Sequence, residues 1–220
     1  LLEILTHIRH SEKVFIMNKL LLILILTFSF QTLSKADDIR DFQIEGMSVG
    51  DSLLDYFSED QIQLFINDDN AFFYKEKKYV AITTHAKNIQ PYAEAKDNYE
   101  YVGVVIIPTD KKYEIYGISA YLNFHNNIED CKKKKKEIVS SIIYAFENAT
   151  KIEEESPHTY DKSGNSISYD TWFNLDLGLA SVHCEDWSKK IEKENGWNDK
   201  LKVDLRSEKF DNFLINEAYQ

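Results

Sequence analysis

"SVHCEDWSKK", residues 181–190, is the stretch that decides the fold. We predict a strand over residues 180–187, in which successive side chains point to opposite faces. Val182 and Cys184 then share the face toward the core, and His183 and Glu185 share the other face. One strand therefore carries a buried sulfur on one side and titratable groups on the other.

The sequence contains two cysteines, Cys131 and Cys184, so a single intramolecular pairing is possible. Cys131 lies on a predicted helix, in an apolar stripe with Ile138 and Ile142. Both thiols are expected to face the same interior, and we predict a disulfide between them. Two separate reduced thiols are the alternative. The disulfide prediction depends on export, because disulfides persist in oxidising compartments.

The N-terminal segment has the three regions of a secretory signal peptide. Lys19 follows Met17, residues 20–30 are mostly apolar, and Ser34 and Ala36 form a small-residue cleavage site. The apolar run is too short to cross a bilayer core of ~30 Å at ~1.5 Å per residue. We expect residues 17–36 to be a signal peptide, and an uncleaved anchor is the alternative.

These assignments divide the chain into three parts. Residues 1–16 are expected to be an upstream translated extension, and residues 37–220 are expected to form one mature domain. That length is ample for a single hydrophobic core. The predicted location of the mature domain is the periplasm or the exterior.

The mature chain is strongly acidic. The full sequence has 26 basic and 37 acidic residues, and residues 1–36 hold four of the basic and two of the acidic ones. Residues 37–220 therefore carry 22 against 35, a net charge of −13. Such a surface disfavours nucleic acid and anionic lipid as partners. A small ligand or an envelope protein is the expected partner, with no stable membrane insertion after signal cleavage.

Hydrophobic periodicity and turn residues predict the order of elements. Helices are expected over 48–57 and 58–66, 127–149 and after Ser207; hairpins over 72–83, 99–124 and 167–187; and a strand over 201–207. The expected helix caps are Ser58, either Asn126 or Asn127, and Ser207. Alternation in 201–207 is expected to point Lys202, Asp204 and Arg206 outward. Strands do not alternate regularly with helices, which argues against a parallel sheet. The prediction is an α+β domain with a mostly antiparallel sheet and helices packed on one face.

Two polar segments of the sequence have the composition of possible binding sites. The lysine run 132–136 is expected to be a solvated helix face, with Lys135 near the buried stripe, and an anion or docking site is the alternative. Asp161, Ser163 and Asn165 alternate as in a calcium loop, but the sixth-position glycine and twelfth-position acid are missing. A plain turn is therefore predicted there.

Catalytic signatures are scarce in this sequence. It contains no glycine-rich phosphate loop and no H-E-x-x-H. His183 and Glu185 on one strand face could ligate a metal, but no paired-ligand spacing supports this reading. We therefore assign no catalytic, cofactor-binding or metal-binding residue, and the assigned site residues are the disulfide pair Cys131 and Cys184.

The stretches "IEGMSVGDSLLDYFSEDQI" at 44–62, "DKSGNSISYDTW" at 161–172 and "SVHCEDWS" at 181–188 carry a resemblance. They resemble a group of small uncharacterised exported bacterial proteins, over most of the mature chain. The resemblance implies a signal peptide and this order of helices and strands. It implies no activity and no site residues.

The expected function is therefore a non-enzymatic binding or interaction module, exported and taking an unknown ligand. An aromatic-rich sheet face left uncovered by helices could hold a small ligand. The alternative is a periplasmic hydrolase-like enzyme with a site assembled around His183 and nearby carboxylates, with Glu185 or Asp186 as the partner.

Overall fold

The computed structural model describes residues 38–89, 99–125, 127–147 and 149–218. Contacts divide the chain into two units, Leu1–Lys35 and Ala36–Gln220, and every described residue belongs to the second. The predicted extension at 1–16 and the predicted signal peptide at 17–36 lie outside the described residues. None of the helices in the described ranges combines the length and the apolar character that spanning a bilayer requires.

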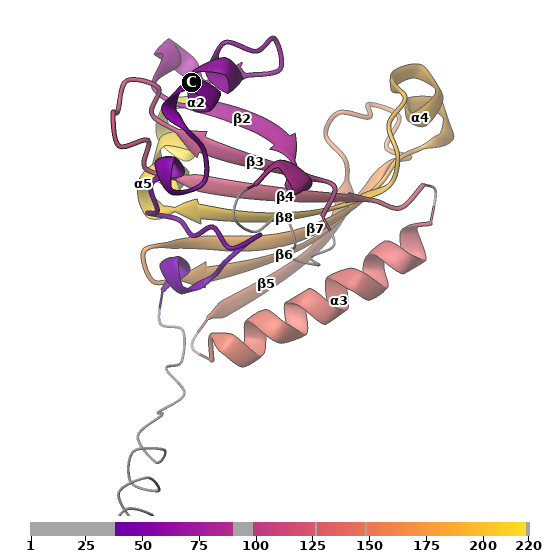
Figure 1. Ribbon diagram of the computed structural model, residues 1–220. Coiled ribbons are helices and arrows are strands. Elements are labelled where there is room, and N and C mark those ends of the chain that lie inside the picture. The colour runs from indigo at the N-terminus through magenta and orange to yellow at the C-terminus, as the bar shows by residue number, and fades with distance from the viewer. Residues whose placement is uncertain (1–37, 90–98, 126, 148, 219–220) are drawn as a thin grey trace, which may run out of the picture. The chain divides into compact units, whose positions relative to one another are not determined.

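The described strands form one antiparallel sheet in the order β1-β2-β3-β4-β8-β7-β6-β5 (Figure 1). Strands β1 to β4 make one meander and β5 to β8 make a second, and the two meet where β4 pairs with β8. The strands are β1 Phe72–Phe73, β2 Val80–His85, β3 Tyr101–Ile106, β4 Gly117–Asn123, β5 Thr150–Pro157, β6 Ile167–Leu175, β7 Gly178–Asp186 and β8 Lys200–Ser207.

Helices and turns connect and flank the strands of both meanders. The α-helices among the described residues are α2 Glu59–Ile66, α3 Ile128–Ala145, α4 Lys189–Asn195 and α5 Glu208–Phe213. Shorter turns lie at η1 Ile39–Asp41, η2 Leu53–Asp55, η3 Lys75–Lys77, η4 Ala86–Asn88 and η6 Leu214–Ala218. Ser58 caps α2 through its side chain, as predicted, and of the two asparagines expected at the start of α3 the cap is Asn127. The prediction of an α+β domain with an antiparallel sheet is confirmed.

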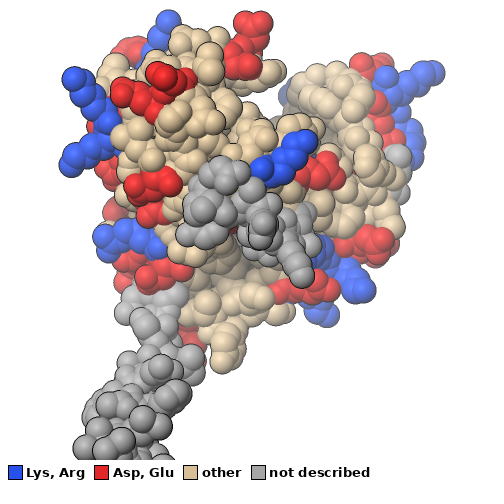
Figure 2. Space-filling model, viewed as in Figure 1, with Lys and Arg blue, Asp and Glu red and all other residues tan. Residues whose placement is uncertain are grey.

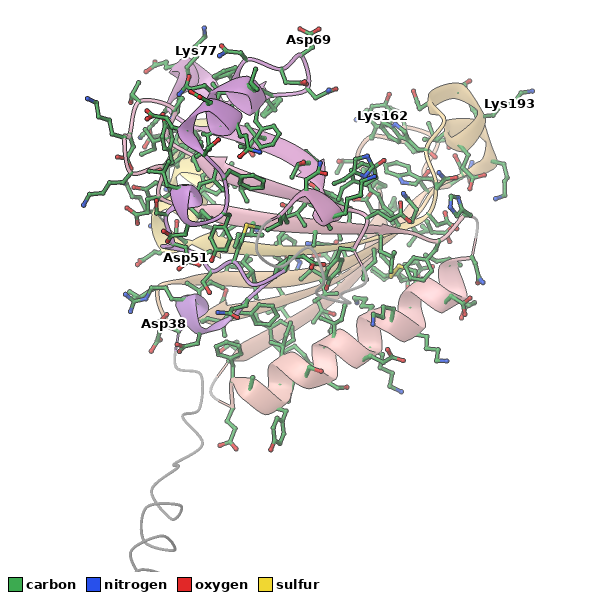
Figure 3. The ribbon with its side chains drawn as sticks, viewed as in Figure 1. Asp38, Asp51, Asp69, Lys77, Lys162 and Lys193 are labelled. Atoms are coloured by element: carbon green, nitrogen blue, oxygen red, sulfur yellow. A yellow bond between two sulfur atoms is a disulfide. The ribbon has the colours of Figure 1, made fainter. Side chains whose placement is uncertain are left out.

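The main core lies against one face of the sheet. Alternate residues of β7 and β8 point into it and are fully buried: Ala180, Val182, Cys184, Leu201, Val203 and Leu205. Helices α2 and α3 pack on this face through Ile62 and Ile142. Cys131 of α3 and Cys184 form a disulfide with Cα atoms 6.0 Å apart, which confirms the predicted pair (Figure 3).

The helix predicted over 48–57 does not form, and this prediction was wrong. A single 3-10 turn lies there, because backbone groups of the segment pair with another part of the chain. Gly50 and Leu53 donate to the carbonyls of Ile115 and Tyr113, at 2.8 and 3.0 Å. Gly50 has φ of 93°, a left-handed conformation outside helical geometry. The apolar spacing still marks burial, since Leu53 is fully buried.

Strand β5 and helix α4 are not among the predicted elements. Strand β5 lies at the edge of the sheet and is exposed along most of its length, so it has no apolar alternation. Helix α4 is also mostly polar, but it has local signals. Ser188 caps its start by accepting a hydrogen bond from Ile191, and Gly196 ends it with φ of 68°.

The second face of the sheet has a small apolar cluster at one end. Phe210 and Phe213 of α5 pack there against Tyr79, Val105 and Tyr116, and all five are buried. The predicted capping of this helix by Ser207 is confirmed. Helix α5 lies against only part of this face, and the strands beside it present polar side chains.

Candidate functional site

A cleft of about 290 Å³ lies on the sheet face opposite the disulfide. Strands β4, β6, β7 and β8 supply its polar part, and α5 with the turn after it supplies its apolar end. Its ionisable lining residues are Asp170, His183, Glu185, Lys202, Asp204 and Arg206, and its large apolar lining residues are Tyr74, Trp172, Phe210 and Leu214. We call it the polar cleft.

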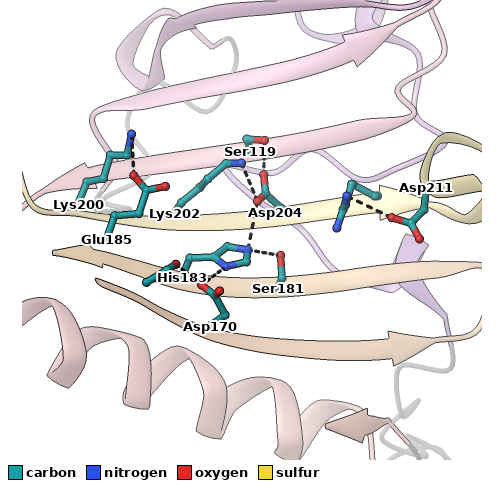
Figure 4. Close-up of polar contacts among 11 residues, drawn as sticks. Ser119, Asp170, Ser181, His183, Glu185, Lys200, Lys202, Asp204 and Asp211 are labelled. Atoms are coloured by element: carbon teal, nitrogen blue, oxygen red, sulfur yellow. Dashed lines mark hydrogen bonds and ion pairs between the residues drawn. The ribbon is translucent and has the colours of Figure 1, made fainter. Parts of the chain in front are cut away.

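His183 is the centre of the polar contacts (Figure 4). Its Nδ1 lies 2.7 Å from Asp170 Oδ1, and its Nε2 lies 2.7 Å from Ser181 Oγ. The Asp204 Oδ2 atom is 3.5 Å from the same Nε2. When the ring is an imidazolium, both nitrogens donate; when Nδ1 alone carries a proton, the Ser181 hydroxyl donates to Nε2. Three strands, β6, β7 and β8, therefore meet at this ring.

Asp204 links His183 to the next strands. Lys202 Nζ lies 2.9 Å from Asp204 Oδ2, and the Ser119 hydroxyl of β4 donates to Asp204 Oδ1. The carboxylate is largely buried, with Asp204 only 7% exposed. A buried carboxylate needs such partners, because transfer of a lone charge out of water is costly.

The pKa values of these groups are shifted as this arrangement of charges predicts. Burial of His183 opposes its charged form, but hydrogen bonds and charge from Asp170 and Asp204 outweigh burial and raise its pKa. Burial also acts against ionised Asp204, yet Lys202 and His183 lower the pKa of that carboxyl far below its usual range. The pKa of Lys202 is raised, because the charge of Asp204 outweighs its desolvation.

Arg206 and Trp172 lie beside this network. The Arg206 guanidinium carbon is 5.5 Å from the centre of the Trp172 ring, and its Nη1 is 3.2 Å from Asp211 Oδ1. The Trp172 ring also meets the His183 ring edge to face, with centroids 4.7 Å apart. Trp172 therefore bridges the charged network and the arginine.

Glu185 and Asp186 do not contact His183 in the way expected of catalytic partners. Glu185 shares the His183 face, as predicted, but its carboxylate pairs with Lys200 at 3.1 Å. Strand alternation places Asp186 on the other face. The carboxylates that reach His183 are Asp170 and Asp204, and they come from other strands.

The lysine run on α3 does not gather into one site. Lys132 lies over the Tyr169 ring with Nζ 3.8 Å from the centroid, and Lys134 lies 3.9 Å from Glu137. Burial lowers the pKa of Lys135, consistent with its predicted position near the buried stripe. In the view of Figure 2, acidic and basic side chains are interspersed over the surface.

The turn at residues 161–166 is built on one carboxylate. Asp161 accepts hydrogen bonds from the backbone and hydroxyl groups of Ser163 and Ser166, and from the Ser188 hydroxyl. These donors lower its pKa. They also join this loop to the start of α4, and Lys162 and Lys193 lie on the same projecting part of the molecule (Figure 3). The plain turn predicted here agrees with this geometry.

Among the described residues, no group of three or more His, Cys, Asp or Glu side chains is arranged to hold a metal ion. Comparisons with protein-family models, with curated proteins and with solved structures find no match to this chain. The resemblance to exported bacterial proteins therefore stays an expectation.

Reasoning from the sequence identified His183 but missed the residues around it, namely Ser119, Asp170, Ser181, Lys202 and Asp204. A partial signal was present. The alternation of the predicted strand 201–207 put Lys202, Asp204 and Arg206 on the outward face, and β8 confirms it. What was missing was the strand order, which makes this outward face adjoin the face of His183.

Proposed function

We propose that this protein is an exported, non-enzymatic binding module that takes a small polar ligand in the polar cleft. One observation carries the proposal: a cleft of about 290 Å³, on the sheet face that α5 covers only in part, combines buried and half-buried charged groups with an aromatic wall. Ligand sites are typically concave and combine apolar walls with a few placed polar groups.

Export is supported by two features. The segment 17–36 has the pattern of a signal peptide, and the mature part carries an intramolecular disulfide between Cys131 and Cys184. Intact mass of protein recovered from an exported fraction tests this part. The expected mass starts after Ala36 and includes the disulfide; full-length protein found only in the cytoplasm would contradict export.

The binding part is tested with saturation-transfer NMR against a panel of sugars, amino acids and organic acids. Ser168→Trp is expected to fill the cleft, because Ser168 lines it and hydrogen-bonds to Asp170. Ser140→Trp on the exposed side of α3 is the matched control. We expect binding to the wild type and the control variant, and loss of binding to Ser168→Trp. A panel with no compound behaving in this way would contradict the proposal.

A hydrolase is the second candidate, because Ser181, His183 and Asp170 form a chain of contacts of 2.7 Å each. This is the order of groups in a Ser-His-Asp triad. Two observations weigh against it. Ser181 is fully buried and does not line the cleft, and Asp204 competes for the same ring nitrogen.

The two candidates predict different reactivity of Ser181. A fluorophosphonate probe labels a serine that an adjacent histidine activates. Under the binding proposal, mass spectrometry finds no labelled Ser181, and chromogenic ester hydrolysis is the same in the wild type and Ser181→Ala. Labelling at Ser181 that disappears in His183→Gln would favour the hydrolase.

A further inference from the structure

The carboxylates that line the polar cleft are already paired. Asp170 accepts from Ser168 and faces His183, with both contacts below 2.8 Å. Asp204 has Lys202 and Ser119 as partners, and Glu185 is paired with Lys200. Each of these three carboxylates therefore already faces a cation or a donor of the protein itself.

Arg206 is different, because its guanidinium has more N–H donors than the protein supplies acceptors for. A guanidinium carries five N–H groups and accepts nothing. The structure pairs Arg206 Nη1 with Asp211, while its buried Nε has no hydrogen-bond partner among the described residues. Unsatisfied buried donors cost free energy, so an acceptor supplied by a ligand would stabilise this group.

The apolar end of the cleft begins at Arg206. Its backbone pairs with Gly117 across β4 and β8. Phe210 packs over Gly117, where an added Cβ would lie 3.3 Å from the Phe210 ring. The Trp172 ring lies 5.5 Å from the guanidinium carbon. Unused donors and aromatic surface are therefore adjacent.

On the basis of the proposed function, we infer that the ligand of the polar cleft is a small organic carboxylate with an apolar or aromatic body. Arg206 donates to the carboxylate, since a guanidinium matches the planar geometry of that group. The apolar body packs against Trp172 and Phe210.

Three probes of similar shape and different charge test the inference: benzoate, benzamide and benzylamine. The readout is the indole N–H resonance of Trp172, assigned with a Trp172→Phe variant. The chain has three tryptophans, and Trp187 and Trp197 contact each other in another cluster, with ring centroids 4.7 Å apart. They serve as internal controls. We expect saturable shifts at Trp172 alone, with benzoate bound about 10- to 100-fold more tightly than benzamide.

Arg206→Gln removes the guanidinium, and we expect it to weaken benzoate binding by about 10- to 100-fold. Arg206→Lys keeps the charge without the planar group, and we expect an intermediate loss. Arg40→Gln is the matched control, because Arg40 is 59% exposed and pairs with Asp38 away from the cleft. Unchanged dispersion of the Trp187 and Trp197 resonances confirms that each variant is folded.

The failures are distinguishable. Equal binding of benzamide or benzylamine would overturn the carboxylate inference but leave the cleft as a small-ligand site. Benzoate binding that survives Arg206→Gln would overturn it too. The absence of a saturable Trp172 shift with all three probes would overturn the inference, and the panel with Ser168→Trp then decides the proposed function separately.

Discussion

Cys184 and His183 are consecutive residues of β7, and their side chains lie on opposite faces of the sheet. Cys184 is bonded to Cys131 in the main core, while His183 contacts Asp170, Ser181 and Asp204 at the polar cleft. The crosslink that fixes α3 to β7 therefore also fixes the strand that carries the central histidine. Stability and site geometry are coupled through one strand.

Removal of the disulfide should lower the free energy of unfolding. The bond closes a loop with a sequence separation of 53 residues, for which chain entropy predicts about 4 kcal/mol. We expect the double variant Cys131→Ser, Cys184→Ser to lose about 2–4 kcal/mol in urea unfolding. The matched control is the reductant: it should destabilise the wild type by a similar amount and leave the double variant unchanged. A double variant as stable as the oxidised wild type would contradict this prediction.

The charge state of His183 should make stability depend on pH. Its pKa is raised above 6.5 in the folded state, so its contribution is complete below pH 6.5. That contribution is lost as the pH rises through the folded pKa. We expect the free energy of unfolding to fall over this range in the wild type and to stay flatter in His183→Gln. NMR titration of the His183 ring checks the direction of the shift.

The carboxylates of the same network should act in the opposite direction. The pKa values of Asp170 and Asp204 are both lowered below 3.8 in the folded state, so their contribution is present above that pH. It is lost as the pH falls through the folded pKa values. Acid unfolding of Asp204→Asn should therefore be less steep than that of the wild type, as followed by circular dichroism.

Asp204→Asn should also be destabilising at neutral pH, because it leaves Lys202 and His183 without their shared anion. Breaking a buried pair costs about 3–5 kcal/mol, and partial exposure of Lys202 reduces this to about 2–3 kcal/mol. The Lys202 side chain is 30% exposed. Asp69→Asn at an exposed loop is the control and should change stability by less than about 0.5 kcal/mol. A lowered pKa of His183 in Asp204→Asn would be the accompanying NMR signature.

Gly178 tests the close packing between β7 and β8. An added Cβ would overlap the Arg206 carbonyl oxygen and would lie 2.9 Å from Ile39. Backbone must therefore move, and we expect Gly178→Ala to cost about 2–3 kcal/mol in urea unfolding. Gly164→Ala meets no atom within 4 Å, and its φ of +74° should cost only about 1–2 kcal/mol. A Gly178→Ala variant as stable as the wild type would show that the strands can separate there.

Local patterns predicted those elements whose signals lie within a few residues. The capping groups Ser58 and Ser207 mark real helix starts, and the alternation in 201–207 orients β8 correctly. The same reasoning failed at 48–57, where the backbone bonds to a distant segment. The apolar periodicity there indicates which side chains are buried, but it does not indicate which backbone groups form hydrogen bonds with one another.

The sequence by itself determined the class of the domain and the face on which His183 lies, because alternation and capping are local properties of the chain. It also limited the cysteines to one possible intramolecular pair. Alternation also puts Ser181 on the face of His183, two residues away on the same strand. Only the tertiary structure decided that Asp170 and Asp204 reach His183, since these two contacts depend on strand order and register. Residue 204 lies opposite residue 181 across β7 and β8, and residue 170 lies opposite residue 183 across β6 and β7. Register of this kind is set by the packing of the whole sheet and by its turns, so no single segment encodes it.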